Sequence, residues 1–140
     1  MDLLVVDDEE MVGRIFSQRL RKEVREGSVR LHLATSGAAA LEILASLGQD
    51  PVLVLTDINM PGMSGLELVR KIRSRGGSPQ IYVVSAYEND DYRRTSLAAG
   101  ADGFIPKPMD FSLLRGLLGL EEPAPPDGES VIFPVLPKGS

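Results

Sequence analysis

The chain has no cysteine and only one histidine, His32, among its 140 residues. The absence of cysteine excludes disulfide bonds, thiolate metal ligands and thiol nucleophiles. A single histidine excludes a metal site built from several imidazoles. Any chemistry in this protein therefore depends on carboxylates, hydroxyl groups, amines and backbone oxygens.

Long apolar runs are also absent. The N-terminal run Leu3–Val6 is far too short for a signal peptide or a membrane span. We therefore expect a cytoplasmic protein without a membrane segment. The net charge of −5 gives no electrostatic attraction to nucleic acid, so we expect no direct nucleic-acid contact. A hydrophobic share of 43% and a charged share of 25% are typical of a soluble globular protein.

The chain divides into a body, residues 1–120, and a tail, residues 121–140. Five of the 10 prolines lie in the tail, between Pro123 and Pro137, which indicates a proline-rich tail or linker. The tail has one apolar stretch, Val131–Leu136. We expect this stretch either to fold back onto the body or to pair with a second copy in a homodimer. The alternative is the start of a linker to a further domain.

Five strands are predicted in the body. Continuous apolar runs indicate three strands that are buried on both faces: Leu3–Val6, Val52–Leu55 and Ile81–Val84. Two weaker segments are predicted as edge strands: Val29–Leu33, which alternates apolar with polar residues, and Gly103–Ile105, which Pro106 stops.

Helical patterns fill the gaps between these strands. They run from Met11 to Leu20, from Ser36 to Leu47, from Ser64 to Ile72, from the cap candidates Asn89, Asp90 and Asp91 to Gly100, and from Asp110 to Leu117. A strand–helix unit repeated five times predicts an α/β fold with a parallel sheet and helices on both faces. Three central and two edge strands match the flavodoxin-like, doubly wound five-stranded order 2-1-3-4-5.

Polar residues follow the carboxyl ends of four predicted strands. Asp7 and Asp8 follow the first strand, Asp57 the third, Ser85 the fourth and Lys107 the fifth. In an open α/β sheet these ends form one rim, where ligands bind. Neighbouring strands are ~4.8 Å apart, so Asp8 and Asp57 can share one ion. We expect all five side chains to converge.

The charge at this rim predicts a cation. Three carboxylates and one ammonium leave two negative charges in a small cleft. Oxygen ligands without histidine or cysteine favour Mg²⁺. Asp57 can then attack phosphorus as a carboxylate nucleophile, while Lys107 and the Ser85 hydroxyl hold the phosphoryl oxygens. Considered alone, an aspartate at a strand end is more often a helix cap, and only the combination points to catalysis.

Four stretches resemble the receiver domain of two-component response regulators. They are Val5–Glu9, Asp57–Gly65, Val84–Ala86 and Ala98–Pro108, and the resemblance covers residues 2 to about 119. Each motif alone is weak, but four motifs in order on one rim are specific. Phe104 departs from the many members that have tyrosine at that position.

The resemblance implies a role for each matching residue. Asp57 would be the phosphoacceptor and Lys107 its phosphoryl partner. The metal ligands would be Asp8 directly, Asp7 mainly through water, Asp57, and the backbone carbonyl of Asn59. The switch pair would be the Ser85 hydroxyl and the Phe104 ring, and the Lys107–Pro108 bond is often cis in this family.

The function implied by this resemblance is phosphorelay signal transduction. The receiver would accept a phosphoryl group from a histidine kinase or phosphotransfer protein onto Asp57. It would then switch the surface of the helix ending near Gly100, the strand at Gly103–Ile105 and the helix after Asp110. Its output would be a downstream protein effector or a fused output domain. It would be no enzyme beyond catalysing its own Mg²⁺-dependent phosphorylation and dephosphorylation.

Three alternatives remain, the weakest of which is hydrolysis of free small molecules, which similar folds support although fold does not imply function. A flavodoxin-like nucleotide-binding protein is disfavoured because the acidic run Asp7–Glu10 occupies the turn where a phosphate cradle needs glycines. A phosphorylation-independent docking module is disfavoured by the retention of all five site residues. Arg93 and Arg94 are interpreted as a solvated helix face, with a partner surface as the second reading, and His32 as a polar-face residue without a chemical role.

Overall fold

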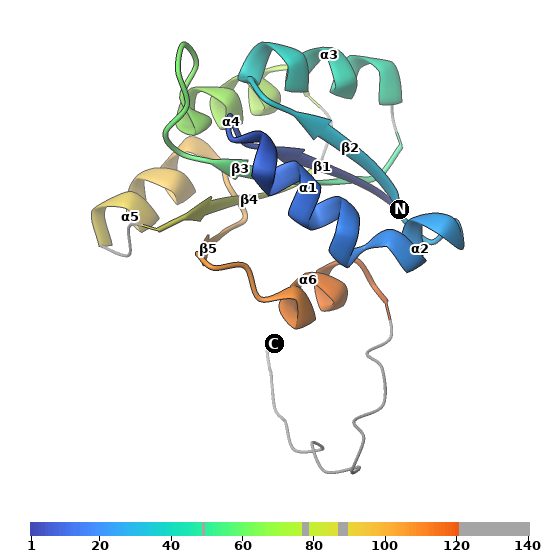
Figure 1. Ribbon diagram of the computed structural model, residues 1–140. Coiled ribbons are helices and arrows are strands. Elements are labelled where there is room, and N and C mark those ends of the chain that lie inside the picture. Colours follow the sequence, from blue (N-terminus) through green and yellow to red (C-terminus); the bar gives the residue numbers. More distant parts are fainter. Residues whose placement is uncertain (49, 77–78, 87–89, 121–140) are drawn as a thin grey trace.

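The computed structural model describes residues 1–48, 50–76, 79–86 and 90–120. Strands and helices alternate along this part of the chain (Figure 1). The elements are, in order, β1 (Asp2–Val6), α1 (Glu10–Arg19), α2 (Arg21–Arg25), β2 (Arg30–Ala34), α3 (Gly37–Leu47), β3 (Val52–Asp57), α4 (Gly65–Ser74), β4 (Gln80–Ser85), α5 (Asp90–Ala99), β5 (Gly103–Pro106) and α6 (Phe111–Leu117).

The five strands form one parallel sheet in the order β2-β1-β3-β4-β5. The predicted fold class is therefore confirmed. The strands differ from the prediction by one or two residues at their ends, because β3 continues through Asp57 and β4 through Ser85. Pro106, expected to stop the fifth strand, is its last residue; its missing N–H is tolerated because β5 is an edge strand.

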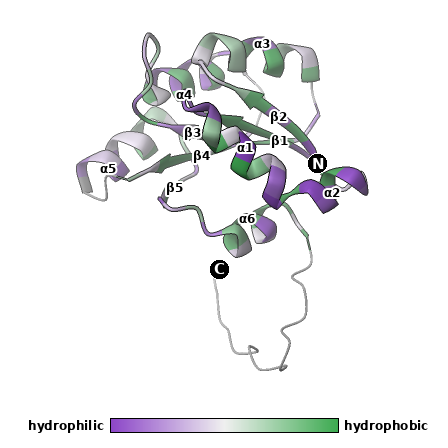
Figure 2. Cartoon of the chain, viewed as in Figure 1, coloured by the Kyte–Doolittle hydropathy of each residue, from purple (hydrophilic) through white to green (hydrophobic). Residues whose placement is uncertain are grey.

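The sheet separates two hydrophobic cores. Successive side chains of a strand point to opposite faces, so each central strand supplies both cores. Leu4 and Val54 pack with α3, α4 and α5, whereas Leu3 and Leu53 pack with α1 and α6. Figure 1 shows the same division of the helices, and Figure 2 shows the hydrophobic central strands between them. This two-sided burial explains the continuous apolar runs in the sequence.

Polar side chains begin three helices as predicted. Ser36 accepts a hydrogen bond from the N–H of Ala39 and caps α3. Ser64 and Glu67 form the reciprocal capping box of α4. Asp110 accepts hydrogen bonds from the first N–H groups of α6. For α5, which begins at Asp90, the cap candidate Asn89 lies outside the described residues.

One local feature differs from the predictions. The single helix expected after β1 is interrupted at Leu20, and a separate, mostly hydrophilic helix α2 follows (Figure 2). Leu33 of the edge strand β2 is 43% exposed. His32 is half-buried, and its Nε2 lies 2.9 Å from Oδ1 of Asp2.

None of the described helices is long and apolar enough to cross a membrane. The tail, residues 121–140, and its apolar stretch Val131–Leu136 lie outside the described residues. The division into a body and a tail therefore stays a prediction.

Asp2 anchors the edge of the sheet at the end opposite the predicted site. Its carboxylate is 2% exposed and lies 2.9 Å from His32 Nε2 and 2.8 Å from Arg30 Nη2. Burial by itself would raise the pKa of Asp2, but the hydrogen bonds and charges of His32 and Arg30 outweigh it and hold the pKa below its usual range. The ionised carboxylate therefore stabilises the pairing of β1 with β2.

We predict that Asp2→Asn lowers the free energy of unfolding at pH 7 by about 1–3 kcal/mol, because it removes hydrogen bonds between charged groups. A depressed pKa gives stability that is present above the unfolded value near ~3.9 and is lost as the pH falls through the folded value. The variant should therefore lose less stability than the wild type on acidification below about pH 4. Urea unfolding at several pH values measures both effects.

Asp50→Asn is the matched control, because Asp50 also lies near Arg30, at 3.5 Å, but is 57% exposed. Its effect should stay within about 0.5 kcal/mol. Equal destabilisation by the two substitutions would contradict the role given to Asp2.

Candidate functional site

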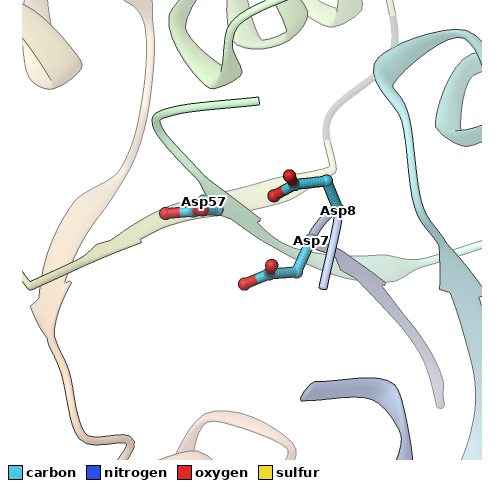
Figure 3. Close-up of side chains that lie close together, drawn as sticks. All are labelled: Asp7, Asp8 and Asp57. Carbon is cyan, nitrogen blue, oxygen red and sulfur yellow. The ribbon is translucent and has the colours of Figure 1, made fainter. Parts of the chain in front are cut away.

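Three carboxylates meet at the carboxyl ends of β1 and β3 (Figure 3). Asp7 and Asp8 directly follow β1, and Asp57 is the last residue of β3, its neighbour in the sheet. One oxygen from each carboxylate lies within 4.8 Å of the others. These three carboxylates therefore lie together at the rim of the sheet.

Asp7 and Asp8 differ in their surroundings. Asp7 is 6% exposed, and its Oδ1 accepts a hydrogen bond of 3.0 Å from the N–H of Glu9. Its Oδ2 lies 3.3 Å from Lys107 Nζ. Asp8 is exposed. Asp7 is thus held by protein groups, whereas Asp8 faces the solvent side of the cluster.

Asp57 is oriented by its own loop and by Lys107. Its Oδ1 accepts a hydrogen bond of 2.9 Å from the N–H of Ile58 and lies 3.5 Å from Lys107 Nζ. Burial raises the pKa of Asp57, the charge of Lys107 lowers it, the charge of Asp7 raises it, and the net direction is upward. The carboxylate is therefore held in a site where its negative charge is poorly solvated.

Lys107 supplies the positive charge of the site and directly follows β5, two strands away from β3. The backbone N–H of Lys107 donates a hydrogen bond of 2.9 Å to the carbonyl of Ser85, and the Lys107–Pro108 peptide bond is cis. Burial by itself would lower the pKa of Lys107, but the carboxylates of Asp57 and Asp7 raise it above its usual value. The lysine is therefore cationic between these two carboxylates.

Ser85, Asn59 and Phe104 are the remaining residues to which the resemblance assigns a role. Ser85 ends β4 and is 1% exposed, next to β5, after which Lys107 follows. Asn59 is exposed in the loop two residues after Asp57. Phe104 lies in β5 opposite Val83, and its half-buried ring packs with the core under α5 rather than against the carboxylates.

Gly65 packs against the backbone of Asp57, a contact that the motif alone does not reveal. Its N–H donates a hydrogen bond of 2.8 Å to the carbonyl of Ile58. A Cβ at Gly65 would lie 1.9 Å from the backbone oxygen of Asp57, far inside van der Waals contact. The start of α4 therefore packs directly on the loop that carries Asp57. Sequence reasoning placed Gly65 in the motif but could not find this contact, because it joins two segments in space.

The donor set of this site fits a hard divalent cation. Three carboxylates and one ammonium leave two negative charges, and all the available ligands are oxygen atoms.

The same geometry weighs against binding of a nucleotide phosphate at the turn that follows β1. The N–H of Glu9 is bonded to the Asp7 carboxylate, and three nearby negative charges would repel a phosphate that is not paired with a cation.

An apolar groove opens beside the site. It has a volume of about 600 Å³ and is bounded by α1 and by the segment between β5 and α6. Its lining includes Ile15 and Phe16 of α1, Met109 and Phe111 near α6, and both Asp57 and Lys107. An apolar surface therefore adjoins the charged cluster.

Comparisons with known proteins match one family model and several longer curated proteins. A family model described as "Response regulator receiver domain" matches residues 3–118. A cyclic di-GMP phosphodiesterase of Thermotoga maritima is 33% identical over 115 residues, which are 82% of this chain and 29% of that protein. Response regulator MprA of Mycolicibacterium vanbaalenii is 36% identical over 132 residues, which are 91% of this chain and 54% of that protein. The chain thus spans about half, or less, of the length of these curated relatives.

A solved structure has the same arrangement of elements. The beryllofluoride-activated N-terminal receiver domain of RstA from Klebsiella pneumoniae superposes with a TM-score of 0.72 at 27% identity, covering 85% of this chain and 96% of that chain.

Proposed function

The chain belongs to the response regulator receiver domain family, and from this premise we propose that it accepts a phosphoryl group on the carboxylate of Asp57 and thereby switches a protein surface. The observation that carries the proposal is the contact of Asp57 with one ammonium, Lys107, inside a cluster of three carboxylates. This cluster provides a nucleophile, a cation that binds phosphoryl oxygens, and ligands for a metal ion.

The proposed reaction is a displacement at phosphorus. An oxygen of Asp57 forms a bond to phosphorus, the bond between phosphorus and the donor atom breaks, and the donor leaves with that electron pair. Lys107, 3.5 Å from Asp57 Oδ1, neutralises charge on the phosphoryl oxygens. Hydrolysis removes the phosphoryl group from Asp57. Water attacks phosphorus, inorganic phosphate leaves and the carboxylate is restored. The chain would thus act as a switch that catalyses only changes to itself.

Mg²⁺ is the cofactor that fits these residues. The carboxylates of Asp7, Asp8 and Asp57 and the backbone carbonyl of Asn59 would hold it, with Asp7 acting mainly through water. When bound, the ion neutralises the carboxylates and the phosphoryl oxygens. Asp7 already bonds to Glu9 and Lys107, whereas Asp8 is exposed, which supports Asp8 as the more direct ligand.

The proposed switch connects Asp57 with Ser85 and Phe104. Ser85 ends β4, the strand next to Asp57, and Phe104 lies on β5, the strand after it. A phosphoryl group that draws the Ser85 hydroxyl inward would leave space for the Phe104 ring. The ring movement would repack the surface formed by α5, β5 and α6. Phosphorylation would shift this equilibrium because the two states differ in their affinity for the phosphoryl group.

The phosphoryl donor would be a histidine kinase or a phosphotransfer protein that docks over α1. Two apolar side chains of α1, Met11 and Ile15, are 62% and 44% exposed, and Ile15 also lines the same groove as Asp57. An apolar partner surface placed there would bring a phosphohistidine to the carboxylate. The signal would then pass to a downstream effector or a fused output domain.

We predict that Asp57→Asn abolishes phosphorylation by acetyl phosphate and Mg²⁺ while the fold is retained, because the amide oxygen is a far poorer nucleophile than a carboxylate. Intact mass spectrometry should show one phosphoryl adduct on the wild type and none on the variant. The exposed variant Asp50→Asn should be phosphorylated like the wild type. A stable adduct on folded Asp57→Asn would show that another residue is the acceptor.

A second prediction concerns the metal. Asp8→Ala should weaken Mg²⁺ binding, measured by calorimetry, more than Asp7→Ala does. Without Mg²⁺ it should raise the free energy of unfolding by up to ~1 kcal/mol, because it relieves repulsion between neighbouring carboxylates. Asp7→Ala should not show this gain, since it also removes the bonds to Glu9 and Lys107. An unchanged Mg²⁺ affinity in Asp8→Ala would refute the ligand assignment.

The proposed docking of the phosphoryl donor over α1 gives a third prediction. Ile15→Ser should slow phosphoryl transfer by about tenfold when the donor is a phosphohistidine protein that phosphorylates the wild type. This is the loss expected for one partly buried apolar anchor. Phosphorylation by acetyl phosphate should not change, because Ile15 takes no part in the chemistry. Leu97→Ser, which removes an equally exposed side chain from α5, is the control. Equal slowing by both substitutions would place the donor elsewhere.

A further inference from the structure

The ring of Phe104 is covered by an arginine from the neighbouring helix. The guanidinium carbon of Arg93, on α5, lies 5.2 Å from the centroid of the Phe104 ring on β5. Arg93 is exposed and Phe104 is half-buried. The cation therefore lies on the solvent side of the ring, while the other side of the ring packs against the core.

Arg94, the next residue of α5, provides a contrast. It is exposed like Arg93 and carries the same charge, but it forms an ion pair with Asp91, one turn earlier on the same helix. This ion pair lies within α5, whereas the contact of Arg93 joins α5 to β5. The contact of Arg93, unlike this ion pair, depends on the position of the Phe104 ring.

We propose that Arg93 is a positioning residue for Phe104: its contact with the ring favours the unphosphorylated arrangement and so sets how readily the receiver switches. This inference rests on the proposed function, in which the Phe104 ring moves inward toward the space left by Ser85. It adds a residue outside the acceptor cluster that determines the balance between the two states. It also gives one of the two adjacent arginines a role other than a solvated surface charge.

The geometry makes the contact sensitive to movement of the ring. A cation attracts an aromatic face within about 6 Å of the centroid, so at 5.2 Å an inward displacement of about 1 Å already ends the contact. The ring moves away from Arg93 because the guanidinium lies on its outer side. An exposed contact of this kind shifts an equilibrium by about two- to fivefold. That factor tunes the switch without preventing it.

Beryllofluoride, a stand-in for the phosphoryl group, measures this balance in the full chain. A ligand that prefers one state binds more tightly when the competing state is destabilised. Arg93→Ala should therefore bind beryllofluoride with Mg²⁺ about two- to fivefold more tightly than the wild type. Arg94→Ala, which removes the same charge from the same helix, should bind like the wild type. Arg93→Lys keeps a cation over the ring and should restore affinity towards the wild-type value.

Amide NMR spectra recorded in the same titration separate the possible failures. Wild-type shifts around Phe104 on beryllofluoride binding, together with equal affinities in Arg93→Ala and Arg94→Ala, would overturn the inference and leave the switch intact. Weaker binding by Arg93→Ala would also overturn it, because the contact would then favour the active state. An absence of any shift around Phe104 in the wild type would overturn both the switch and the role of Arg93.

Discussion

The electrostatic conflict at the carboxyl ends of β1 and β3 is the constraint on which the rest of this molecule depends. Parallel pairing of adjacent strands brings Asp7, Asp8 and Asp57 together, so that carboxylate oxygens lie within 4.8 Å of one another. Lys107 alone cannot neutralise them, and the pKa of Asp57 is raised by its burial and by the charge of Asp7. The fold thus holds a site whose negative charge favours a divalent cation.

Backbone hydrogen bonds and close packing hold the carboxylates of this site in place despite their mutual repulsion. The N–H groups of Ile58 and Glu9 bind the carboxylates of Asp57 and Asp7, and Gly65 lets α4 approach the Asp57 loop without a side chain in between. The backbone N–H of Lys107 bonds to the carbonyl of Ser85, so the segment after β5 is joined to the end of β4, where the proposed switch hydroxyl lies. Lys107, which contacts Asp57, is therefore connected by its backbone to β4.

Sequence patterns predicted most of the architecture because each pattern has a local cause. The capping box of Ser64 and Glu67 and the cap at Asp110 depend on contacts within three residues, and both are present. Features that depend on contacts between distant residues were not predicted. The break of the first helix at Leu20 was not expected. The pairing of His32 with Asp2 was not visible in the sequence because the two residues are 30 positions apart.

Residue order alone was enough to predict the strand order, the two-sided burial of the central strands and the three carboxylates at one rim of the sheet. Periodicity and the strand–helix alternation are sufficient for these, since few parallel topologies satisfy them. The contacts between individual groups are visible only in the folded chain: Lys107 with Asp7 and Asp57, Gly65 with the Asp57 backbone, and Arg93 with Phe104. The physical reason is that such contacts depend on rotamers, loop paths and helix packing to within about an ångström, and residue order does not carry that information.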